Sequence, residues 1–326
     1  MKMKITGTGS SLPREQVSNK KIMEWVETSD EWIQERTGIA GRHISTGETV
    51  PSLAADACKK ALDQAGVDAA EVDAILLATC SPEWLLPCAA CQVQDMIGAV
   101  NAVAFDINAA CSGFLFGLTT AQAYIASGMY KKILVVGSEV LSKIMNWEDR
   151  TSCILFGDGA GAALVEAVDD SDVSGMISFA QGSDGAKGMV LSCRERLLSN
   201  PLYTEEDSDE DFYVHMDGQA VYRFATRQVP DCIKEALDKV DMTVEDIDLF
   251  VLHQANARII EAAAKRLHAD IEKFPMNIDR MGNMSSATIP VLLDELNREG
   301  RLNRGDKLVL SGFGAGLTYG ACVLSW

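Results

Sequence analysis

The sequence predicts an α/β protein made of two similar halves, residues 1–170 and 171–326, each with a mixed sheet and a buried central helix. The first observation is an internal repeat: EVDAILLATCS (71–81) aligns with DIDLFVLHQAN (246–256) at an offset of 175 positions. The second is a set of uninterrupted apolar runs, typical of strands covered on both faces. The third is a helix-like segment that is apolar on every side, which predicts a core helix.

The repeat continues without a gap across three stretches of the chain. ALD at 61–63 aligns with ALD at 236–238, and KILVVG at 132–137 aligns with KLVLSG at 307–312. Each stretch has the same hydrophobic pattern of amphipathic helix, turn and short apolar strand. The period is too long for a solenoid, so it indicates a duplicated unit.

The individual elements follow from these patterns in chain order. The N-terminal MKMKITGTGSSLP is typical of a strand and a turn. Val103–Ile107 is strand-like, and the apolar run over 112–127 predicts the buried helix. Further buried strands are expected at AILLAT (74–79), KILVVG (132–137), LFVLH (249–253) and KLVLSG (307–312).

Composition excludes several classes of protein. Apolar residues make up 47% and charged residues 23% of the 326 positions, an ordinary globular balance. No run of about 18 uncharged apolar residues indicates a membrane span, and the N-terminus lacks the apolar core of a signal peptide. We therefore expect a cytoplasmic protein with no membrane partner. The net charge of −18 argues against nucleic acid. The acidic run 205–211 is interpreted as a solvated loop, because it lacks EF-hand spacing.

The nine cysteines are irregularly spaced and mostly lie among apolar or small residues. This favours reduced thiols in a reducing compartment over a disulfide framework. Cys88 and Cys91 form a CxxC pair, but neither a second pair nor paired histidines accompanies it, so no metal is expected. Packing is the favoured interpretation of these two thiols.

Cys111 is the first candidate for chemistry. It lies between the strand at Val103–Ile107 and the apolar helix, so we expect it at a helix N-terminus. Free backbone N–H groups there favour the thiolate and would lower the pKa of Cys111. The alternative from Cys111 alone is a small buried hydrophobe.

His253 and Asn283 are the candidate partners of Cys111. The 175-residue offset places NAAC (108–111) on NMSS (283–286), so Cys111 and Asn283 belong to equivalent strand-to-helix junctions. His253 ends a predicted strand, where α/β proteins place functional groups. Either residue alone could be structural, His253 as a core histidine and Asn283 as a helix cap. Together with Cys111 they indicate acyl transfer through a thioester.

Two glycine-rich segments are candidate ligand-binding loops. GDGAGAALVEA (157–167) and SGFGAGLTYGA (311–321) lack the spacing and the acidic residue of a dinucleotide site. Tight turns explain the first segment. The second can direct backbone N–H groups at a developing oxyanion.

These motifs together resemble the β-ketoacyl-[acyl-carrier-protein] synthase III family, the initiating condensing enzymes of bacterial fatty-acid synthesis, in the thiolase-like superfamily. The resemblance runs the whole length of the chain, from ITGTGSSLP and TSDEWIQERTGI through ACQVQ, DINAACSGF, FGDGAGAA, HQANARII and GNMSSATIP to FGAGLTYGA. It implies a duplicated thiolase-like fold and a decarboxylative Claisen condensation of an acyl-CoA primer with malonyl-acyl-carrier protein. Cys111 would carry the acyl group, and His253 and Asn283 would stabilise the enolate. The backbone of Cys111, Gly314 and Ala315 would hold the oxyanion, provided that φ at Ala315 is negative.

The resemblance also implies binding residues, with acyl-CoA as a substrate and no permanently bound cofactor. It implies a homodimer in which Leu86 caps the acyl pocket of the partner, and a side chain smaller than the usual aromatic there predicts longer or bulkier primers. A local basic patch on an acidic enzyme would steer the acidic carrier protein. The CoA-binding positions would be Trp32, Arg36, Arg150 and Asn256, and the carrier-protein positions Arg223, Gln254, Arg258, Lys265 and Arg266.

Two alternatives stay open from the sequence. One is a related Cys-His-Asn condensing enzyme of secondary metabolism, which would use coenzyme A throughout. The other is a Cys-His acyl thioesterase, in which His253 would activate water and Asn283 would have no task. An acyl-binding homologue without activity would be expected to lack one of the three residues. The sequence specifies neither the primer nor a role for 205–211.

Overall fold

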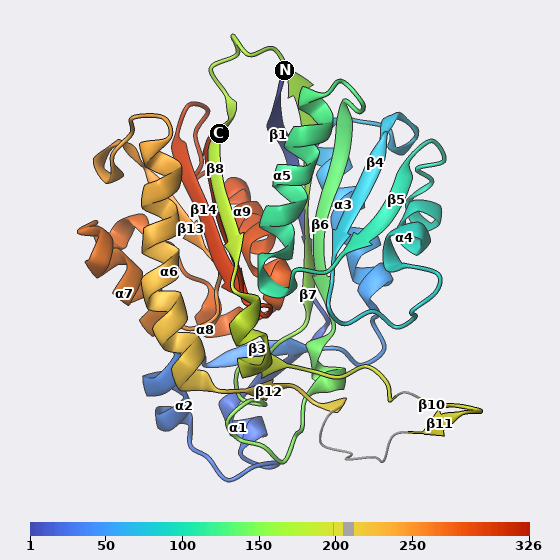
Figure 1. Ribbon diagram of the computed structural model, residues 1–326, viewed down its shortest axis with the longest axis vertical. Coiled ribbons are helices and arrows are strands. Elements are labelled where there is room, and N and C mark those ends of the chain that lie inside the picture. Colours follow the sequence, from blue (N-terminus) through green and yellow to red (C-terminus); the bar gives the residue numbers. More distant parts are fainter. Residues whose placement is uncertain (198, 205–211) are drawn as a thin grey trace.

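The computed structural model describes residues 1–197, 199–204 and 212–326. Two sheets stand side by side, with helices between them and on both outer sides (Figure 1). Both termini lie at one end of the molecule, and the shorter elements gather at the opposite end. This arrangement confirms the predicted α/β class with mixed sheets and buried central helices.

The first sheet has five strands in the order β1-β7-β6-β4-β5. β4 runs parallel to β5 and β6, whereas β7 is antiparallel to both β6 and β1. Every residue of β4 is buried, as an apolar strand covered on both faces should be. The strands are β1 (Lys2–Ser11), β4 (Ala74–Ala78), β5 (Val103–Ile107), β6 (Lys132–Glu139) and β7 (Gly159–Val168).

The second sheet has four strands in the order β8-β15-β14-β13. β13 runs parallel to β14, and β15 is antiparallel to both β14 and β8. The strands are β8 (Gly175–Ser183), β13 (Leu249–Leu252), β14 (Lys307–Gly314) and β15 (Thr318–Ser325). The order β8-β15-β14-β13 in this sheet repeats the order β1-β7-β6-β4 in the first sheet. The proposed division at residues 170 and 171 falls in the connection from β7 to β8 and stays a prediction.

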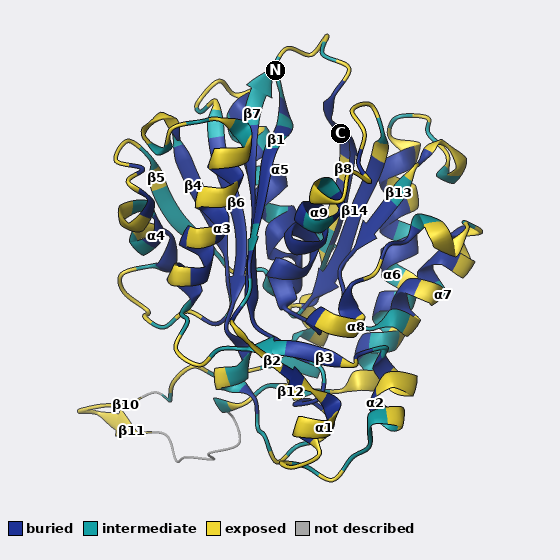
Figure 2. Cartoon of the chain, turned by 180° about the vertical axis from the view of Figure 1, so that it is seen from behind, coloured by how far each residue is buried: buried dark blue, intermediate teal, exposed yellow. Residues whose placement is uncertain are grey.

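Helices fill three layers around the two sheets. α5 (Gly113–Ala126) and α9 (Thr288–Arg298) lie between the sheets and share one hydrophobic core with both. α3 (Val50–Ala65) and α4 (Ala89–Ile97) cover the outer face of the first sheet. α6 (Gly218–Asp238) and α7 (Ala257–Leu267) cover that of the second. Figure 2 shows the strands and the central helices as the most deeply buried part.

Local chemistry sets the helix boundaries. α3 begins at Val50 because the Thr49 hydroxyl accepts a hydrogen bond from the Ser52 N–H, and it ends at Gly66 in the left-handed region. α5 follows directly on a short 3₁₀ turn, η2 (Ala110–Ser112), and α9 follows on its counterpart η8 (Ser285–Ala287). These two turns contact each other. They bring the equivalent junctions of the two halves together.

The remaining described elements lie mostly at the end of the molecule away from the termini (Figure 1). β2 pairs with β3, and β12 pairs with β9. Their bounds are β2 (Glu15–Ser18), α1 (Asn19–Ile22), α2 (Asp30–Thr37), β3 (Gly41–Ile44), β9 (Leu191–Ser192), β10 (Ser199–Asn200), β11 (Tyr203–Thr204), β12 (His215–Met216) and α8 (Ile278–Met281).

Candidate active site

Cys111 lies in η2, between the end of β5 and the start of α5, as predicted. Ala110, just before it, has a φ of 45°, and Ser285, at the equivalent position of η8, has a φ of 47°. Residues with a side chain rarely adopt this left-handed conformation, and such strain concentrates at functional sites. The two turns thus share a backbone conformation, and they contact each other.

The glycine-rich turn after β14 approaches the backbone of Cys111 closely. A Cβ atom added to Gly314 would lie 2.6 Å from the backbone nitrogen of Cys111 and 3.1 Å from that of Ser112. Only glycine allows this approach. Ala315 is not among the residues with positive φ, so the condition set by the sequence is met.

The prediction that the helix N-terminus lowers the pKa of Cys111 is wrong for the unliganded protein. Burial raises the pKa of the Cys111 thiol to about 12, and a hydrogen bond with the Ser285 side chain only partly offsets it. The nearby buried carboxyl of Glu139 raises the pKa further. Removal from water disfavours the thiolate more strongly than the helix end favours it. Burial therefore favours the neutral thiol of Cys111 in the unliganded protein.

His253 follows β13 directly, and its backbone N–H donates to the Ser311 carbonyl at 2.8 Å. Its side chain is buried, which lowers the pKa of the imidazole to about 3 and keeps it neutral. The ring of Phe313 packs edge-on against it, with centroids 5.6 Å apart. The Nδ1 atom of His253 lies 2.6 Å from the hydroxyl oxygen of Thr288.

The Thr288 hydroxyl is the hydrogen-bond partner of the Nδ1 atom of His253. Its oxygen also lies 3.0 Å from the Ser285 carbonyl, so its single proton has two acceptors within reach. If the proton is donated to Nδ1 of His253, the ring's own proton is on Nε2. The contact with Nδ1 is the shorter of the two.

Asn283 precedes η8, and its side-chain oxygen accepts a hydrogen bond from the Ser285 N–H at 2.9 Å. Its backbone N–H donates to the Leu155 carbonyl at 2.9 Å. Asn283 therefore does cap the following turn, one of the two interpretations of the sequence. That bond occupies the amide oxygen and leaves the amide nitrogen as the donor of this side chain.

Cys111, His253 and Asn283 line one cavity of about 130 Å³. The rest of its wall is mainly apolar and includes Phe313 and Gly314. Cys111 also faces a second cavity of about 280 Å³, whose other lining residues are Cys80, Asn108, Ala110, Leu141, Ile144, Phe156, Leu191, Ser192, Cys193, Val214, Ser285 and Ala315. The thiol thus lies where two cavities meet.

The four predicted CoA-binding residues form two neighbouring pairs. The guanidinium carbon of Arg150 lies 5.4 Å from the centre of the Trp32 ring. The side chain of Asn256 caps α7 and donates to the Arg36 carbonyl at 3.0 Å. Asn256 also lines the cavity of Cys111, His253 and Asn283. Through Asn256, the backbone of Arg36 is thus linked by a hydrogen bond to a residue that lines that cavity.

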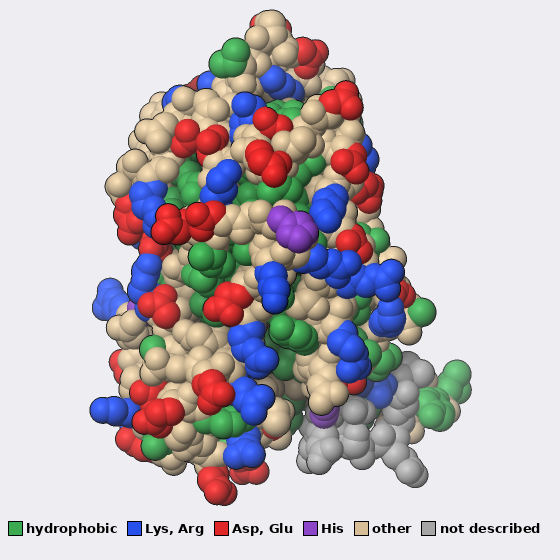
Figure 3. All heavy atoms as spheres, turned by 90° about the vertical axis from the view of Figure 1, so that its left-hand side faces the viewer, with side chains coloured by type: hydrophobic (Ala, Val, Ile, Leu, Met, Phe, Trp, Pro, Cys, Tyr) green, Lys and Arg blue, Asp and Glu red, His purple; other side chains and the backbone are tan. Residues whose placement is uncertain are grey.

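Four of the five predicted carrier-protein residues are exposed on α6 and α7, where Lys and Arg side chains gather on one face of the molecule (Figure 3). Arg258 lies 5.8 Å from the Tyr222 ring centre. Arg266 pairs with Asp231 at 3.2 Å and so joins the two helices. Arg223 and Lys265 have no ion pair within the described residues.

The prediction that Gln254, the fifth of these residues, contacts the carrier protein is wrong. Its side chain is fully buried, with the amide nitrogen donating to the Leu252 carbonyl at 2.8 Å. Its oxygen accepts from the Asn277 N–H at 3.2 Å. The side chain is therefore fixed inside the fold and cannot reach a docked protein.

Sequence reasoning missed Thr288, Phe313 and Glu139. Glu139 ends β6 and is buried, with no ion pair to any residue that the structure describes, and burial raises its pKa. It accepts hydrogen bonds from Ser81 at 2.6 Å and from Ser286 at 3.0 Å. The run of hydroxyl residues in SSAT (285–288), which begins two residues after Asn283, was a signal that could have identified Thr288.

Two expected absences concern residues 1–197, 199–204 and 212–326 alone. Within them no His, Cys, Asp and Glu side chains cluster as a metal site. No helix there is both long and apolar enough to span a bilayer.

Leu86 is 81% exposed and does not line either cavity of its own chain. The acidic run 205–211 lies outside the described residues.

Known proteins match this chain along its whole length. Residues 105–185 match the family described as 3-oxoacyl-[acyl-carrier-protein] synthase III, and residues 237–326 match its C-terminal domain. The β-ketoacyl-[acyl-carrier-protein] synthase III of Clostridium novyi is 45% identical over 324 residues, 99% of each chain.

Solved structures agree with the sequence matches. The crystal structure of 3-oxoacyl-[acyl-carrier-protein] synthase III from Aquifex aeolicus has a TM-score of 0.92 at 39% identity, covering 99% of this chain and 100% of that one. The priming β-ketosynthase of the R1128 polyketide biosynthetic pathway has a TM-score of 0.90 at 36% identity, covering 99% and 96%. The predicted duplicated, thiolase-like fold class is thereby confirmed. The chain belongs to the β-ketoacyl-[acyl-carrier-protein] synthase III family.

Proposed function

We propose that this enzyme starts fatty-acid synthesis by condensing an acyl-CoA primer with malonyl-acyl-carrier protein through a thioester on Cys111. Membership of the family makes the chain an acyltransferase of this type. The observation that carries the mechanism is the cavity shared by Cys111, His253 and Asn283, with a second cavity on the other side of the thiol. A sulfur between two cavities can exchange a thiol on one side while holding an acyl chain on the other.

The first step is transfer of the acyl group to Cys111. The sulfur of Cys111 attacks the thioester carbonyl, the coenzyme A thiol leaves, and the proton of Cys111 passes to it. The backbone N–H groups of Cys111 and of the turn at Gly314 and Ala315 hold the oxyanion of the tetrahedral intermediate. The close approach of Gly314 to Cys111 supports this assignment. Because burial keeps the free thiol protonated, acylation waits for the substrate.

The second step is decarboxylation of the malonyl thioester in the same cavity. His253 and the amide nitrogen of Asn283 donate hydrogen bonds to the thioester oxygen, where charge develops as CO₂ leaves. The resulting enolate attacks the acyl group on Cys111 and forms the new carbon–carbon bond. Burial supports this role twice, because it keeps His253 neutral and excludes the water that would protonate the enolate.

The donor role of His253 requires its proton on Nε2. Nδ1 must then accept the hydrogen bond from Thr288, which is the shorter of the two contacts of that hydroxyl. Thr288 is therefore assigned as the residue that fixes the tautomer of His253. It touches neither substrate nor sulfur and acts as a positioning residue.

Coenzyme A binds at the rim of this cavity as a substrate that leaves after the first step. Trp32 offers an aromatic face for the adenine, and Arg36 and Arg150 offer charges for the phosphates. Arg150 already lies against Trp32 in the unliganded protein, so adenine would stack beside an existing cation. Asn256 links this region to the catalytic cavity.

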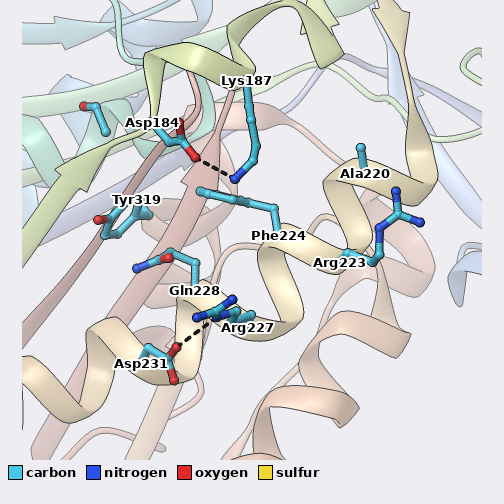
Figure 4. A pocket seen from close by; sticks show the side chains of 10 residues that line it. Asp184, Lys187, Ala220, Arg223, Phe224, Arg227, Gln228, Asp231 and Tyr319 are labelled. Atoms are coloured by element: carbon cyan, nitrogen blue, oxygen red, sulfur yellow. Dashed lines mark hydrogen bonds and ion pairs between the residues drawn. The ribbon is translucent and has the colours of Figure 1, made fainter.

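The carrier protein docks on the exposed cations of α6 and α7. Arg223 lines a groove beside α6 in which Arg227 and Lys187 each pair with an aspartate (Figure 4). Arg223, by contrast, has no such partner in the described part of the chain. An unpaired exposed Arg on an enzyme of net charge −18 is a local attraction for an acidic partner.

A homodimer would give Leu86 its proposed role as a cap on the partner's acyl cavity. β5 is an edge strand, and Val103 on it is half exposed. Trp84 and Leu85 are also exposed beside Leu86, which makes an apolar surface suited to burial against a second copy. The cavity of about 280 Å³ and the leucine cap together favour primers larger than acetyl. Leu86→Phe should then shift the preference towards acetyl-CoA.

A second candidate is the priming condensation of a secondary-metabolite pathway. The R1128 priming ketosynthase matches this chain almost as well as the fatty-acid enzymes do. Both candidates share the chemistry at Cys111, and a condensing enzyme that uses coenzyme A throughout would differ in the donor of the malonyl group. Exposed cations on α6 and α7 favour a carrier protein over malonyl-CoA as that donor.

Intact-mass spectrometry with a panel of acyl-CoAs, followed by malonyl-carrier protein, tests the proposal. We expect one acyl adduct that is absent in Cys111→Ala and is discharged only after the malonyl donor is added. An adduct that water removes at the same rate without the donor would indicate a thioesterase. Failure of every primer to form an adduct would contradict the assignment of Cys111.

A further inference from the structure

Arg42, on β3, is a buried cation to which the mechanism above gives no part. Its side chain is 0% exposed and makes no ion pair with any residue that the structure describes. Burial lowers the pKa of its guanidinium to about 10, so the group still carries its charge at neutral pH. A charge taken out of water is stable only where hydrogen bonds replace its hydration. The hydrogen-bond partners of Arg42 are therefore the groups that it holds in place.

On one side, the guanidinium is linked to the helix that carries two of the predicted CoA-binding residues. Nη1 of Arg42 donates to the side-chain oxygen of Asn19 at 2.8 Å. The amide nitrogen of Asn19 in turn donates to the Asp30 carboxylate, also at 2.8 Å. Asp30 begins α2, the helix of Trp32 and Arg36. Arg42 thus reaches α2 through one intervening side chain.

On the other side, the guanidinium binds the segment that leads into the catalytic cavity. Its Nη2 atom donates to the Ile154 carbonyl at 2.6 Å. The next carbonyl, that of Leu155, accepts the backbone N–H of Asn283 at 2.9 Å. Phe156 then forms a β-bridge with Asn283 and lines both cavities that Cys111 faces. A shift of the Ile154 carbonyl would therefore move the backbone to which Asn283 is hydrogen-bonded.

Two glycines leave room for the stem of Arg42 beside Asn283. A Cβ atom added to Gly282 would lie 3.0 Å from the Cβ atom of Arg42, and one added to Gly157 would lie 3.1 Å from it. Gly282 directly precedes Asn283, and the N–H of Gly157 donates to the Asn283 carbonyl at 3.0 Å. Packing and hydrogen bonds thus both fix Arg42 against the chain at Asn283.

We propose that Arg42 is a positioning residue that holds Asn283 in the catalytic cavity and α2 at the coenzyme A site. This inference rests on the proposed function, and Arg42 itself lines neither cavity. A planar guanidinium directs several N–H groups at fixed angles, so one side chain can hold two segments in register. The two contacts predict two separable effects. Loss of the Ile154 contact should slow CO₂ release, and loss of the Asn19 contact should weaken the binding of acyl-CoA.

Arg42→Met removes every donor of this side chain and keeps most of its length. The KM for acyl-CoA should rise about tenfold. The rate of CO₂ release by pre-acylated enzyme should fall about 10- to 100-fold, as expected when a reacting group is misplaced by about 1 Å. Acylation of Cys111 at saturating acyl-CoA uses other donors and should change less than about twofold. Arg42→Lys keeps the charge and one donor group, so it should recover part of the rate of CO₂ release.

Asn19→Ala separates the two contacts. In this variant Arg42 keeps the Ile154 carbonyl and, at 3.3 Å from Nη1, the Val17 carbonyl. The KM for acyl-CoA should rise as in Arg42→Met, whereas the rate of CO₂ release should stay within about twofold of the wild type. This variant decides the assignment to α2 even if the substitutions of Arg42 prevent folding.

Ser178→Ala is the matched control for a general loss of stability. The buried Ser178 hydroxyl on β8 donates to the Ala236 carbonyl on α6 at 2.5 Å, so its removal weakens the second half without touching either contact of Arg42. The midpoint of urea unfolding should fall, and both kinetic values should stay near those of the wild type.

The wild type measured in the same assays distinguishes failure of this inference from failure of the proposed function. A wild type that forms no acyl adduct would contradict the proposed function itself. With an active wild type, unchanged CO₂ release in Arg42→Met or an unchanged KM in Asn19→Ala would overturn the positioning role. Kinetic losses in Ser178→Ala as large as those in Arg42→Met would overturn it too, because loss of stability would then explain both.

Discussion

Replacing Thr288 with valine should slow decarboxylation far more than acylation. Valine has nearly the shape of threonine but no hydroxyl, so the change removes the partner of His253 Nδ1 without opening a cavity. Thr288 is fully buried and His253 nearly so, and water cannot replace the lost hydrogen bond. Nothing then distinguishes the two neutral tautomers of His253, and the fraction with a proton on Nε2 falls.

The magnitude follows from that unpaired nitrogen. A buried polar group left without its partner costs about 1–3 kcal/mol. If the whole loss falls on the transition state for CO₂ release, the rate decreases by about fivefold to 150-fold. Acylation uses the backbone donors at Cys111 and Gly314, so its rate should change less than twofold. The free energy of unfolding should decrease by the same amount, about 1–3 kcal/mol.

Two separate measurements distinguish this effect from general damage. Stopped incubation with acyl-CoA, read by intact mass, gives the acylation rate of Cys111, and mixing pre-acylated enzyme with malonyl-carrier protein gives the rate of CO₂ release. Thr288→Ser keeps the oxygen and should retain most of the second rate. Equal losses in both steps, or a serine variant as slow as the valine variant, would refute the role assigned to Thr288.

Three further predictions follow from the geometry. The pKa of His253 is about 3 in the folded protein and about 6.5 in the unfolded chain, so the unfolded chain takes up a proton first as pH falls. The free energy of unfolding should therefore decrease between pH 6.5 and pH 3 by up to about 1.4 kcal/mol per pH unit. Urea unfolding measured across this range should show a weaker pH dependence for His253→Asn than for the wild type. Gly314→Ala puts a methyl group 2.6 Å from the Cys111 nitrogen and should slow acylation at least tenfold, whereas Gly185→Ala, with open space around it, should not; equal rates would contradict the close approach. Arg150→Ala should raise the KM for acyl-CoA about tenfold and leave kcat unchanged in steady-state assays, and a change in kcat alone would contradict a binding role.

The strand-to-helix junctions were predictable because the duplication is visible in the sequence. The offset that aligns NAAC with NMSS also aligns Ala110 with Ser285, and both adopt the same left-handed backbone. β5 has the predicted bounds, and α5 begins and ends within one residue of the predicted helix. Local hydrophobic patterns and an internal repeat carry this information without any knowledge of tertiary contacts.

The predictions that were wrong or missing concern contacts between parts of the chain that are distant in sequence. The local environment of Cys111 predicted a lowered pKa, but burial under both halves of the molecule raises it. Gln254 follows His253 directly and was expected on the surface, yet its hydrogen bond with Asn277 holds it in the core. The partner of His253 is Thr288, on a helix of the central layer. Such contacts are set by packing between layers, which periodicity does not encode.

The two equivalent junctions differ in the side chain that each presents. Ser286 occupies the place of Cys111 in the second half, but its hydroxyl bonds the Ala78 carbonyl and Glu139, each at 3.0 Å. A hydroxyl held by two acceptors is a poor nucleophile, so one reactive group remains. Ser81, from the first half, bonds the same carboxylate. Glu139 thus joins both junctions, and in doing so it raises the pKa of Cys111. Burial is the main cause of that raised pKa, and the carboxylate that joins the two junctions adds to it.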